Sequence, residues 1–224
     1  AFSFLAMMFN IPLPGGTTGH AVGGTLIAIL FGPYAACLAV SVALLIQALF
    51  FGDGGILAFG ANCFNMACVL PFTGYFIYHG LKKVVSSDTL AAGIGAYAGI
   101  NAAAFCAAVE FGIQPLLFTD AAGQALYCPY PLWISVPAMM IGHLTLFGLA
   151  EVVFTTGVLA YLRKTSPDLF QLAAPASSSK SLFGLLAALI VATPLGLLAA
   201  GTAWGEWDTE ELADTDFFGS ALGY

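Results

Sequence analysis

Long runs of apolar residues, separated by short clusters of glycine, proline and charged residues, make up most of this sequence. Several runs reach the ~20 residues that an α-helix needs to cross the ~30 Å hydrocarbon core of a bilayer. The short alternating segments typical of membrane β-strands do not occur. The pattern predicts an all-α protein, a polytopic integral membrane helical bundle with about six to seven transmembrane segments in this chain. The apolar segments lie at about 1–11, 20–31, 34–51, 56–81, 91–118, 137–162 and 182–203.

Glycine and proline mark the ends of these segments. Pro12 and Pro14 end the first segment, and Gly32 separates the second from the third. Pro33 then suits the first turn of a new helix. The run Gly52-Asp53-Gly54-Gly55 predicts a tight turn. The second segment is short, which makes it the least certain to cross the membrane completely.

The composition agrees with a membrane protein. Of the 224 residues, 60% are hydrophobic and 8% are charged, whereas soluble proteins carry roughly 25% charged residues. The five cysteines follow no zinc-site or disulfide spacing. The first residue is Ala1, inside an apolar run. We therefore expect a missing segment upstream that includes an N-terminal helix.

The basic residues predict the orientation in the membrane. All five lie in two loops, Lys82 and Lys83 in one and Arg163, Lys164 and Lys180 in the other. Cytoplasmic loops are enriched in lysine and arginine, so both loops are expected in the cytoplasm.

The same reasoning divides the chain into three parts. Residues 1–165 form the expected membrane bundle, and 166–181 form a cytoplasmic linker. Residues 182–224 form an additional transmembrane helix with an acidic tail outside.

Polar side chains inside transmembrane segments are costly and are candidates for function. With a rise of ~1.5 Å per residue, seven of them fall in the outer third of the membrane. They favour a polar pocket that opens outward, although each could instead form a hydrogen bond between helices. The seven are His20, Gln47, Asn62, Asn65, Glu110, Gln114 and His143. Asp53, in the adjacent turn, is a further pocket candidate.

The ionisable residues within the segments leave alternatives open. Glu110 and His143 have similar depths, so they could form a structural ion pair between two helices or could bind a ligand. Glu151 lies nearer the middle of the membrane, where we favour a structural carboxylate over one linked to proton transfer.

The stretch NIPLPGGTTGHAVGG, residues 10–24, contains the sequence's most specific chemical signal. Gly15, Gly16 and Gly19 allow the backbone to turn sharply and to approach a ligand. The imidazole of His20 offers a nitrogen to Ni²⁺, Co²⁺, Cu²⁺ or Zn²⁺. One imidazole does not make a metal site, so these residues alone predict a membrane protein with an outward polar pocket.

Another helix has a surface of small residues. Gly93, Gly95 and Gly99 alternate with alanines between residues 91 and 99. Small residues allow close helix packing, so this face is expected against another helix of this chain or of a partner.

Five blocks in order give the sequence a family likeness. They are MMFNIPLPGGTTGHAVGG, IQALFFGDGG, GANCFNMA, YPLWISVPAM and GTAWGEW. They resemble the CbiM/NikM family, the metal-capturing membrane subunits (S components) of energy-coupling-factor cobalt and nickel transporters. The likeness implies a transporter subunit in the prokaryotic cell (inner) membrane, and not an enzyme. The transported substrate would be Co²⁺ or Ni²⁺, with cobalt for cobalamin synthesis favoured, and no organic cofactor is implied.

The resemblance also implies partners and ligands. The partners would be a transmembrane coupling subunit, two cytoplasmic ATPases and, commonly, a small accessory membrane subunit; no nucleic acid is involved. This chain has no Walker A motif of its own. The metal ligands would be nitrogens of a Met-His start and of the histidine in the GGTTGH block, His20. The sequence contains no Met-His pair. Gln47, Asn62 and Asn65 would orient the ligands by hydrogen bonds.

Two other classes of protein remain as alternatives. An ion-coupled secondary transporter or channel would use Glu110, His143 and Glu151 and would transport without ATPase partners. An intramembrane enzyme would need a Ser/His pair, paired aspartates or an HExxH motif, and none is present.

Overall fold

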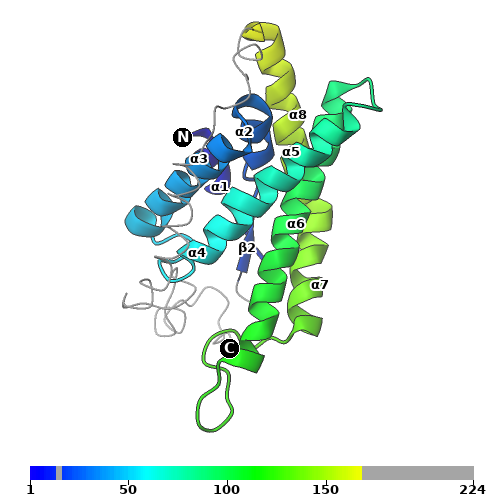
Figure 1. Cartoon of the computed structure of the whole chain (residues 1–224). Helices are drawn as coiled ribbons and strands as arrows, with labels where there is room; N and C mark the ends of the chain where they lie inside the picture. The colour runs from blue at the N-terminus through cyan, green and yellow to red at the C-terminus, as the bar shows by residue number, and fades with distance from the viewer. Residues whose placement is uncertain (14–16, 168–224) are drawn as a thin grey trace, which may run out of the picture.

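The chain forms a bundle of helices around a short β-hairpin (Figure 1). The structure is a computed structural model, which describes residues 1–13 and 17–167. The predicted linker from residue 168 onward, the predicted last helix and the acidic tail lie outside the described residues, as do Gly15 and Gly16. The elements are α1 (Phe2–Met7), β1 (Ile11–Leu13), β2 (Thr17–Gly19), α2 (Gly24–Phe31), α3 (Pro33–Ile46), η1 (Gln47–Phe51), α4 (Phe59–Asn62), η2 (Cys63–Val69), α5 (Leu70–Leu81), α6 (Asp88–Leu117), α7 (Leu132–Gly142), η3 (His143–Phe147) and α8 (Gly148–Thr165), where η denotes a π-helix.

The β-hairpin departs from the expected all-α fold. Strands β1 and β2 pair antiparallel, with Ile11 opposite Gly19. Pro12 and Pro14 explain why this stretch is extended, since the residue before a proline avoids helical geometry. Strand β2 lies among the helices in the middle of the molecule, so the hairpin places the residues after it inside the bundle (Figure 1).

Helix α2 is too short to cross a membrane. It begins at Gly24 and contains eight residues, which corresponds to about 12 Å. Gly32 then adopts φ +87°, and Pro33 starts α3. The predicted segment 20–31 is therefore only a partial span.

Three helical runs in the described part are long and apolar enough to cross a membrane. They are Pro33–Phe51, Asp88–Leu117 and Leu132–Thr165. The run 59–81 is also continuously helical. The last long run starts at Leu132, five residues before the expected start at Pro137. Pro137 lies inside this helix, where its missing N–H removes one backbone hydrogen bond without ending the helical run.

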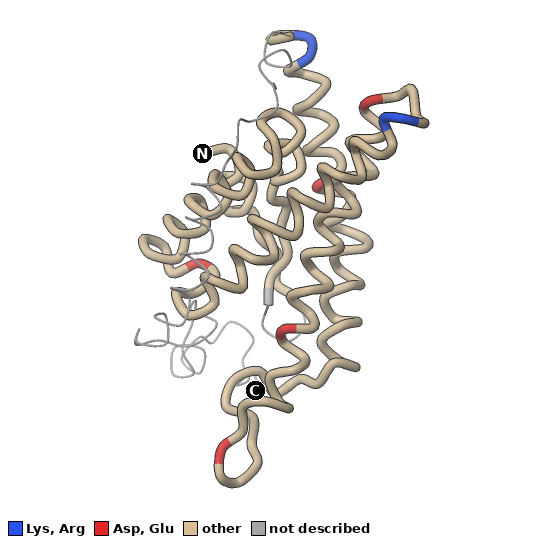
Figure 2. Tube along the Cα trace, viewed as in Figure 1, with Lys and Arg blue, Asp and Glu red and all other residues tan. Residues whose placement is uncertain are grey.

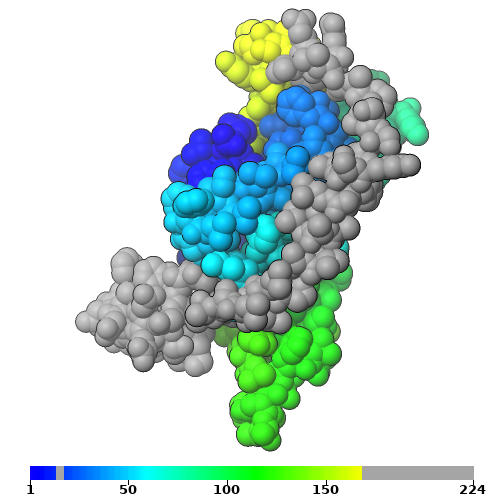
Figure 3. All heavy atoms as spheres, turned by 60° about the vertical axis from the view of Figure 1, so that its left-hand side comes forward, coloured from blue at the N-terminus to red at the C-terminus, as the bar shows by residue number. Residues whose placement is uncertain are grey.

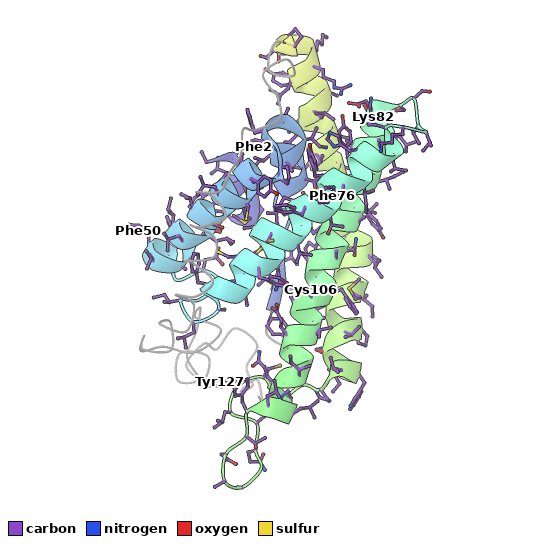
Figure 4. The ribbon with its side chains drawn as sticks, in the orientation of Figure 1. Phe2, Phe50, Phe76, Lys82, Cys106 and Tyr127 are labelled. Carbon is purple, nitrogen blue, oxygen red and sulfur yellow. The ribbon has the colours of Figure 1, made fainter. Side chains whose placement is uncertain are left out.

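The outer faces of the helices are apolar. Phe50 is 78% exposed and Phe76 is 64% exposed, and both lie on helices at the outside of the bundle (Figure 4). Large exposed apolar surfaces are unusual for a soluble monomer, so these faces suit a lipid environment.

The small-residue face of α6 packs within this chain. A Cβ atom on Gly95 would lie 2.7 Å from the carbonyl oxygen of Gly74, and one on Gly99 would lie 2.7 Å from that of Leu70. Both neighbours belong to the α5 run. The interhelical contact predicted for these glycines is therefore made with α5 of the same chain.

The basic residues of the described part gather at one end. The ends of α5 and α8, which carry them, lie at the same end of the molecule (Figure 2). There Lys82 and Arg163 both form ion pairs with Asp88, which also accepts a 2.7 Å hydrogen bond from the Tyr78 hydroxyl. The α6–α7 loop lies at the opposite end from the end of α8 (Figure 3). The basic residues that the structure describes thus share one side, as the sequence predicts.

Candidate metal site

One ring nitrogen of the His20 imidazole is hydrogen-bonded to the backbone. Its Nδ1 lies 3.2 Å from the carbonyl oxygen of Ala21. Because a carbonyl oxygen can only accept, Nδ1 carries the proton in this bond and Nε2 keeps its lone pair. Metal-binding histidines commonly donate a hydrogen bond from their other ring N–H to a carbonyl oxygen in this way.

The backbone beside His20 has little room to move. A Cβ atom on Gly19 would overlap the ring of Phe147. One on Gly23 would lie 2.7 Å from the ring of Phe154, and Gly23 also has φ +74°. Larger residues would therefore displace these rings or strain the backbone.

The same loop is also fixed by hydrogen bonds. The Ser3 hydroxyl donates to the Val22 carbonyl oxygen at 2.6 Å. The amides of Val22 and Gly23 donate to the Glu151 carboxylate at 2.8 Å and 3.0 Å. Glu151 is completely buried. These bonds support the structural interpretation of Glu151 over the proton-linked one.

Two of the predicted pocket residues fix the turn at 52–55. Gln47 donates to the Asp53 carboxylate at 3.1 Å. Asn62 donates to the carbonyl oxygen of Gly54 at 3.0 Å. The turn is thereby tied to η1 and α4, the helical ends on both sides of it.

The suggested ion pair between Glu110 and His143 does not form. The Glu110 carboxylate accepts a 2.7 Å hydrogen bond from Asn65, and Nδ1 of His143 donates to the Met139 carbonyl oxygen at 2.8 Å. Similar depth in the membrane did not bring the two side chains together, because each finds a nearer partner on η2 or on its own helix.

His143 and His20 are nevertheless neighbours. His143 and Asp53 each lie close enough to His20 to interact with it electrostatically. The part of the chain that the structure describes contains no group of three His, Cys, Asp or Glu residues that could hold a metal ion. His20 is therefore a candidate for one ligand within a larger set.

The remaining candidate, Gln114, has a different task. Its side-chain oxygen accepts a 3.2 Å hydrogen bond from the amide of Cys128. It therefore fixes the α6–α7 loop, at the end where Tyr127 lies and opposite the end that carries Lys82 (Figure 4).

The predicted polar residues coincide with irregular helix geometry. The π-helix η1 begins at Gln47, η3 begins at His143, and η2 contains Asn65. Such segments are frequent at functional sites. Hydropathy did not reveal the π-helices. It also did not reveal the contacts that Ser3, Phe147 and Phe154 make with the loop around His20. A polar residue at position 3 of an apolar run was the one available signal for Ser3.

Comparison with known proteins shows the family. The model of CbiM, described as the cobalt uptake substrate-specific transmembrane region, matches residues 1–169. The chain belongs to the CbiM family. It is 54% identical over 218 residues to the fused nickel transport protein NikMN of Rhodobacter capsulatus. The aligned region covers 94% of this chain and 63% of that protein.

Two further relatives have similar identities. The probable fused nickel transport protein LarMN of Lactiplantibacillus plantarum is 52% identical, over 95% of this chain and 64% of that protein. The putative metal transport protein MJ1569 of Methanocaldococcus jannaschii is 56% identical, over 76% of this chain and 74% of its own length. The chain thus spans somewhat less than two thirds of the two fused relatives.

A solved structure has the same fold. A crystal structure of a truncated transition metal transporter superposes with a TM-score of 0.72 at 54% sequence identity. The match covers 73% of this chain and 77% of that chain.

Proposed function

We propose that this chain captures Ni²⁺ or Co²⁺ as the metal-binding membrane subunit of an ATP-driven importer of the energy-coupling-factor type. The observation that carries the proposal is the state of His20. Its Nδ1 is hydrogen-bonded to a carbonyl oxygen, which leaves the lone pair of Nε2 for a metal. Residues of α1, η3 and α8 contact its loop from three sides. A preformed imidazole loses little conformational freedom when it binds a metal.

The other ligands would be nitrogens of a Met-His segment, which the printed sequence does not contain. Ni²⁺ accepts four nitrogens in a plane. Each amide ligand must lose its proton, so metal binding would release protons and would weaken at low pH. The turn at 52–55, tied down by Gln47 and Asn62, would help to cover the site.

Nickel is the first ion to test. The family resemblance favours cobalt, whereas relatives at 54% and 52% identity are named nickel transport proteins. Relatives named as cobalt transport proteins are 29% to 38% identical. Nickel ahead of cobalt is therefore part of the proposal.

The partners are also part of the proposal. They would be a transmembrane coupling subunit, two cytoplasmic ATPases and a small accessory subunit in a prokaryotic cell membrane. The count of about six to seven transmembrane segments in this chain stays a prediction, and it includes the short stretch in which α2 is only a partial span. An ion-coupled carrier is less well supported, because Glu110, His143 and Glu151 bond to separate partners and not to one another.

Uptake of radioactive Ni²⁺ by cells tests the proposal. We expect cells with the native gene product and all of these partner subunits to accumulate Ni²⁺, and we expect accumulation to fall to background when the ATPases carry inactive nucleotide sites. Uptake that persists at the same rate with inactive ATPases would contradict the proposal and favour the ion-coupled carrier.

A further inference from the structure

The peptide groups that follow His20 are held by side chains from two distant helices. The carbonyl oxygen of Val22 accepts from Ser3 of α1 at 2.6 Å, while its amide donates to Glu151 of α8 at 2.8 Å. The next amide, of Gly23, donates to both carboxylate oxygens of Glu151 at 3.0 Å. Both backbone polar groups of Val22, two residues after His20, are therefore hydrogen-bonded to side chains.

Placing the Glu151 carboxylate in this position has a free-energy cost. It is 0% exposed, and burial of a carboxylate inside a membrane bundle carries a large desolvation cost. Two charge-assisted bonds from backbone amides offset part of this cost. Gly23 is also the N-cap of α2, so the carboxylate lies at the helix end that attracts negative charge.

We propose that Glu151 is a positioning residue for metal capture, which holds the loop after β2 so that Nε2 of His20 is presented to the metal. The inference rests on the proposed function of this chain. Glu151 does not bind the metal; it acts through Val22 and Gly23, two and three residues after the imidazole. Helices α2 and α8 lie near each other in the bundle (Figure 1), and this carboxylate joins the start of one to the other.

The packing around the loop makes this role specific. Phe147 occupies the space beside Gly19, and Phe154 the space beside Gly23. These rings exclude water from the loop but cannot accept a hydrogen bond from its amides. Without Glu151 the two amides would be buried and unpaired, which favours a shift of the loop toward other partners.

The test measures Ni²⁺ binding and loop protection together. In the purified native gene product, we expect Glu151→Ala to raise the Kd for Ni²⁺ by about 10- to 100-fold, the usual effect of removing a group that orients a metal ligand. Hydrogen exchange of the amides of Val22 and Gly23 should become faster in the metal-free protein. Glu151→Gln keeps an acceptor oxygen, so it should recover part of both effects.

Thr155→Val is the matched control. Thr155 lies one turn further along α8, is 0% exposed, and its hydroxyl has no hydrogen-bond partner in the described part of the chain. We expect this variant to bind Ni²⁺ and to exchange its loop amides as the unchanged protein does. Ser3→Ala provides a second route, because it removes the other bond to Val22, and we expect a smaller loss of affinity.

The outcomes separate this inference from the proposed function. His20→Ala variants and the unchanged protein report on the function itself: if the unchanged protein binds no Ni²⁺, or if His20→Ala binds it equally, the proposed function fails and the inference fails with it. If those two behave as expected but Glu151→Ala keeps its affinity or its amide protection, only the positioning role is overturned. Equal losses in Glu151→Ala and Thr155→Val would also overturn it. Should Glu151→Ala not fold, Glu151→Gln and Ser3→Ala decide by the same measurements.

Discussion

Two polar regions in the described part of the chain use different chemistry. At the basic end, Asp88 is paired with Lys82 and Arg163, whose side chains are 39% and 40% exposed. Around His20, the polar side chains instead bond to backbone groups, and Glu151 is satisfied by amides. At the aqueous edge, water solvates the charged side chains and lowers the free-energy cost of their charge. Inside the bundle, only fixed dipoles of the protein, such as backbone amides, can do so. The first region should therefore tolerate change, and the second should not.

The largest expected effect comes from a methyl group beside His20. Gly19→Ala would place a Cβ atom inside the ring of Phe147, and overpacking of this kind costs about 1–3 kcal/mol or more. We expect a loss of at least about 2 kcal/mol in thermal unfolding in detergent, together with loss of Ni²⁺ binding.

A matched glycine shows whether this loss is specific to the loop. A Cβ atom on Gly157 of α8 would meet no atom within 4 Å. Gly157→Ala should leave stability unchanged or raise it by up to about 1 kcal/mol, because alanine favours helices. A Gly19→Ala variant as stable as Gly157→Ala would show that the loop is not tightly packed.

The next effect tests which partner Glu110 has. Because Asn65 donates to Glu110 at 2.7 Å, Asn65→Ala should destabilise the protein by about 1–3 kcal/mol. A double-mutant cycle of Asn65→Ala with Glu110→Gln should show coupling above about 0.5 kcal/mol. The same cycle between Glu110→Gln and His143→Ala should be additive. Strong coupling in the second cycle and none in the first would restore the ion pair that the sequence suggested.

The smallest effect is expected at the basic end. Asp88→Asn removes the negative charge of a side chain that is itself only 9% exposed, but its two cationic partners are 39% and 40% exposed. Water screens such partly exposed pairs, so each is expected to contribute about 0–1 kcal/mol. We expect a loss of about 1 kcal/mol at low salt, which shrinks in 1 M salt because the charges are screened. A larger loss that salt does not change would mean that this end is as tightly built as the His20 region.

Much of the fold was predictable because hydropathy reports burial in lipid. The segments 34–51, 56–81 and 91–118 correspond to helical runs of nearly the same extent. The described basic residues also fell on one side (Figure 2). Local backbone chemistry was harder to predict: the hairpin at β1 and β2 is three residues per strand, too short for periodicity to register.

The hydrogen-bond partners of the candidate site residues could not be predicted from the sequence. Glycines around a histidine pointed to His20, and depth in the membrane selected Asn65, Glu110 and His143. Depth in the membrane is only one coordinate, however. Which side chains contact each other also depends on the direction in which each one points around its helix axis. The π-helices η1, η2 and η3 alter that rotation, so no count of residues along a regular helix could assign Glu110 to Asn65.

The most direct test of the central claim is the Ni²⁺ content, by mass spectrometry, of the purified native gene product and its His20→Ala variant. We expect the unchanged protein to hold close to one Ni²⁺ per chain. The variant should hold almost none while it unfolds at a similar temperature, since a loop imidazole contributes little to packing. Equal metal content in the unchanged protein and the His20→Ala variant would contradict the role of His20 and would move the search to the neighbourhood of Glu110 and His143.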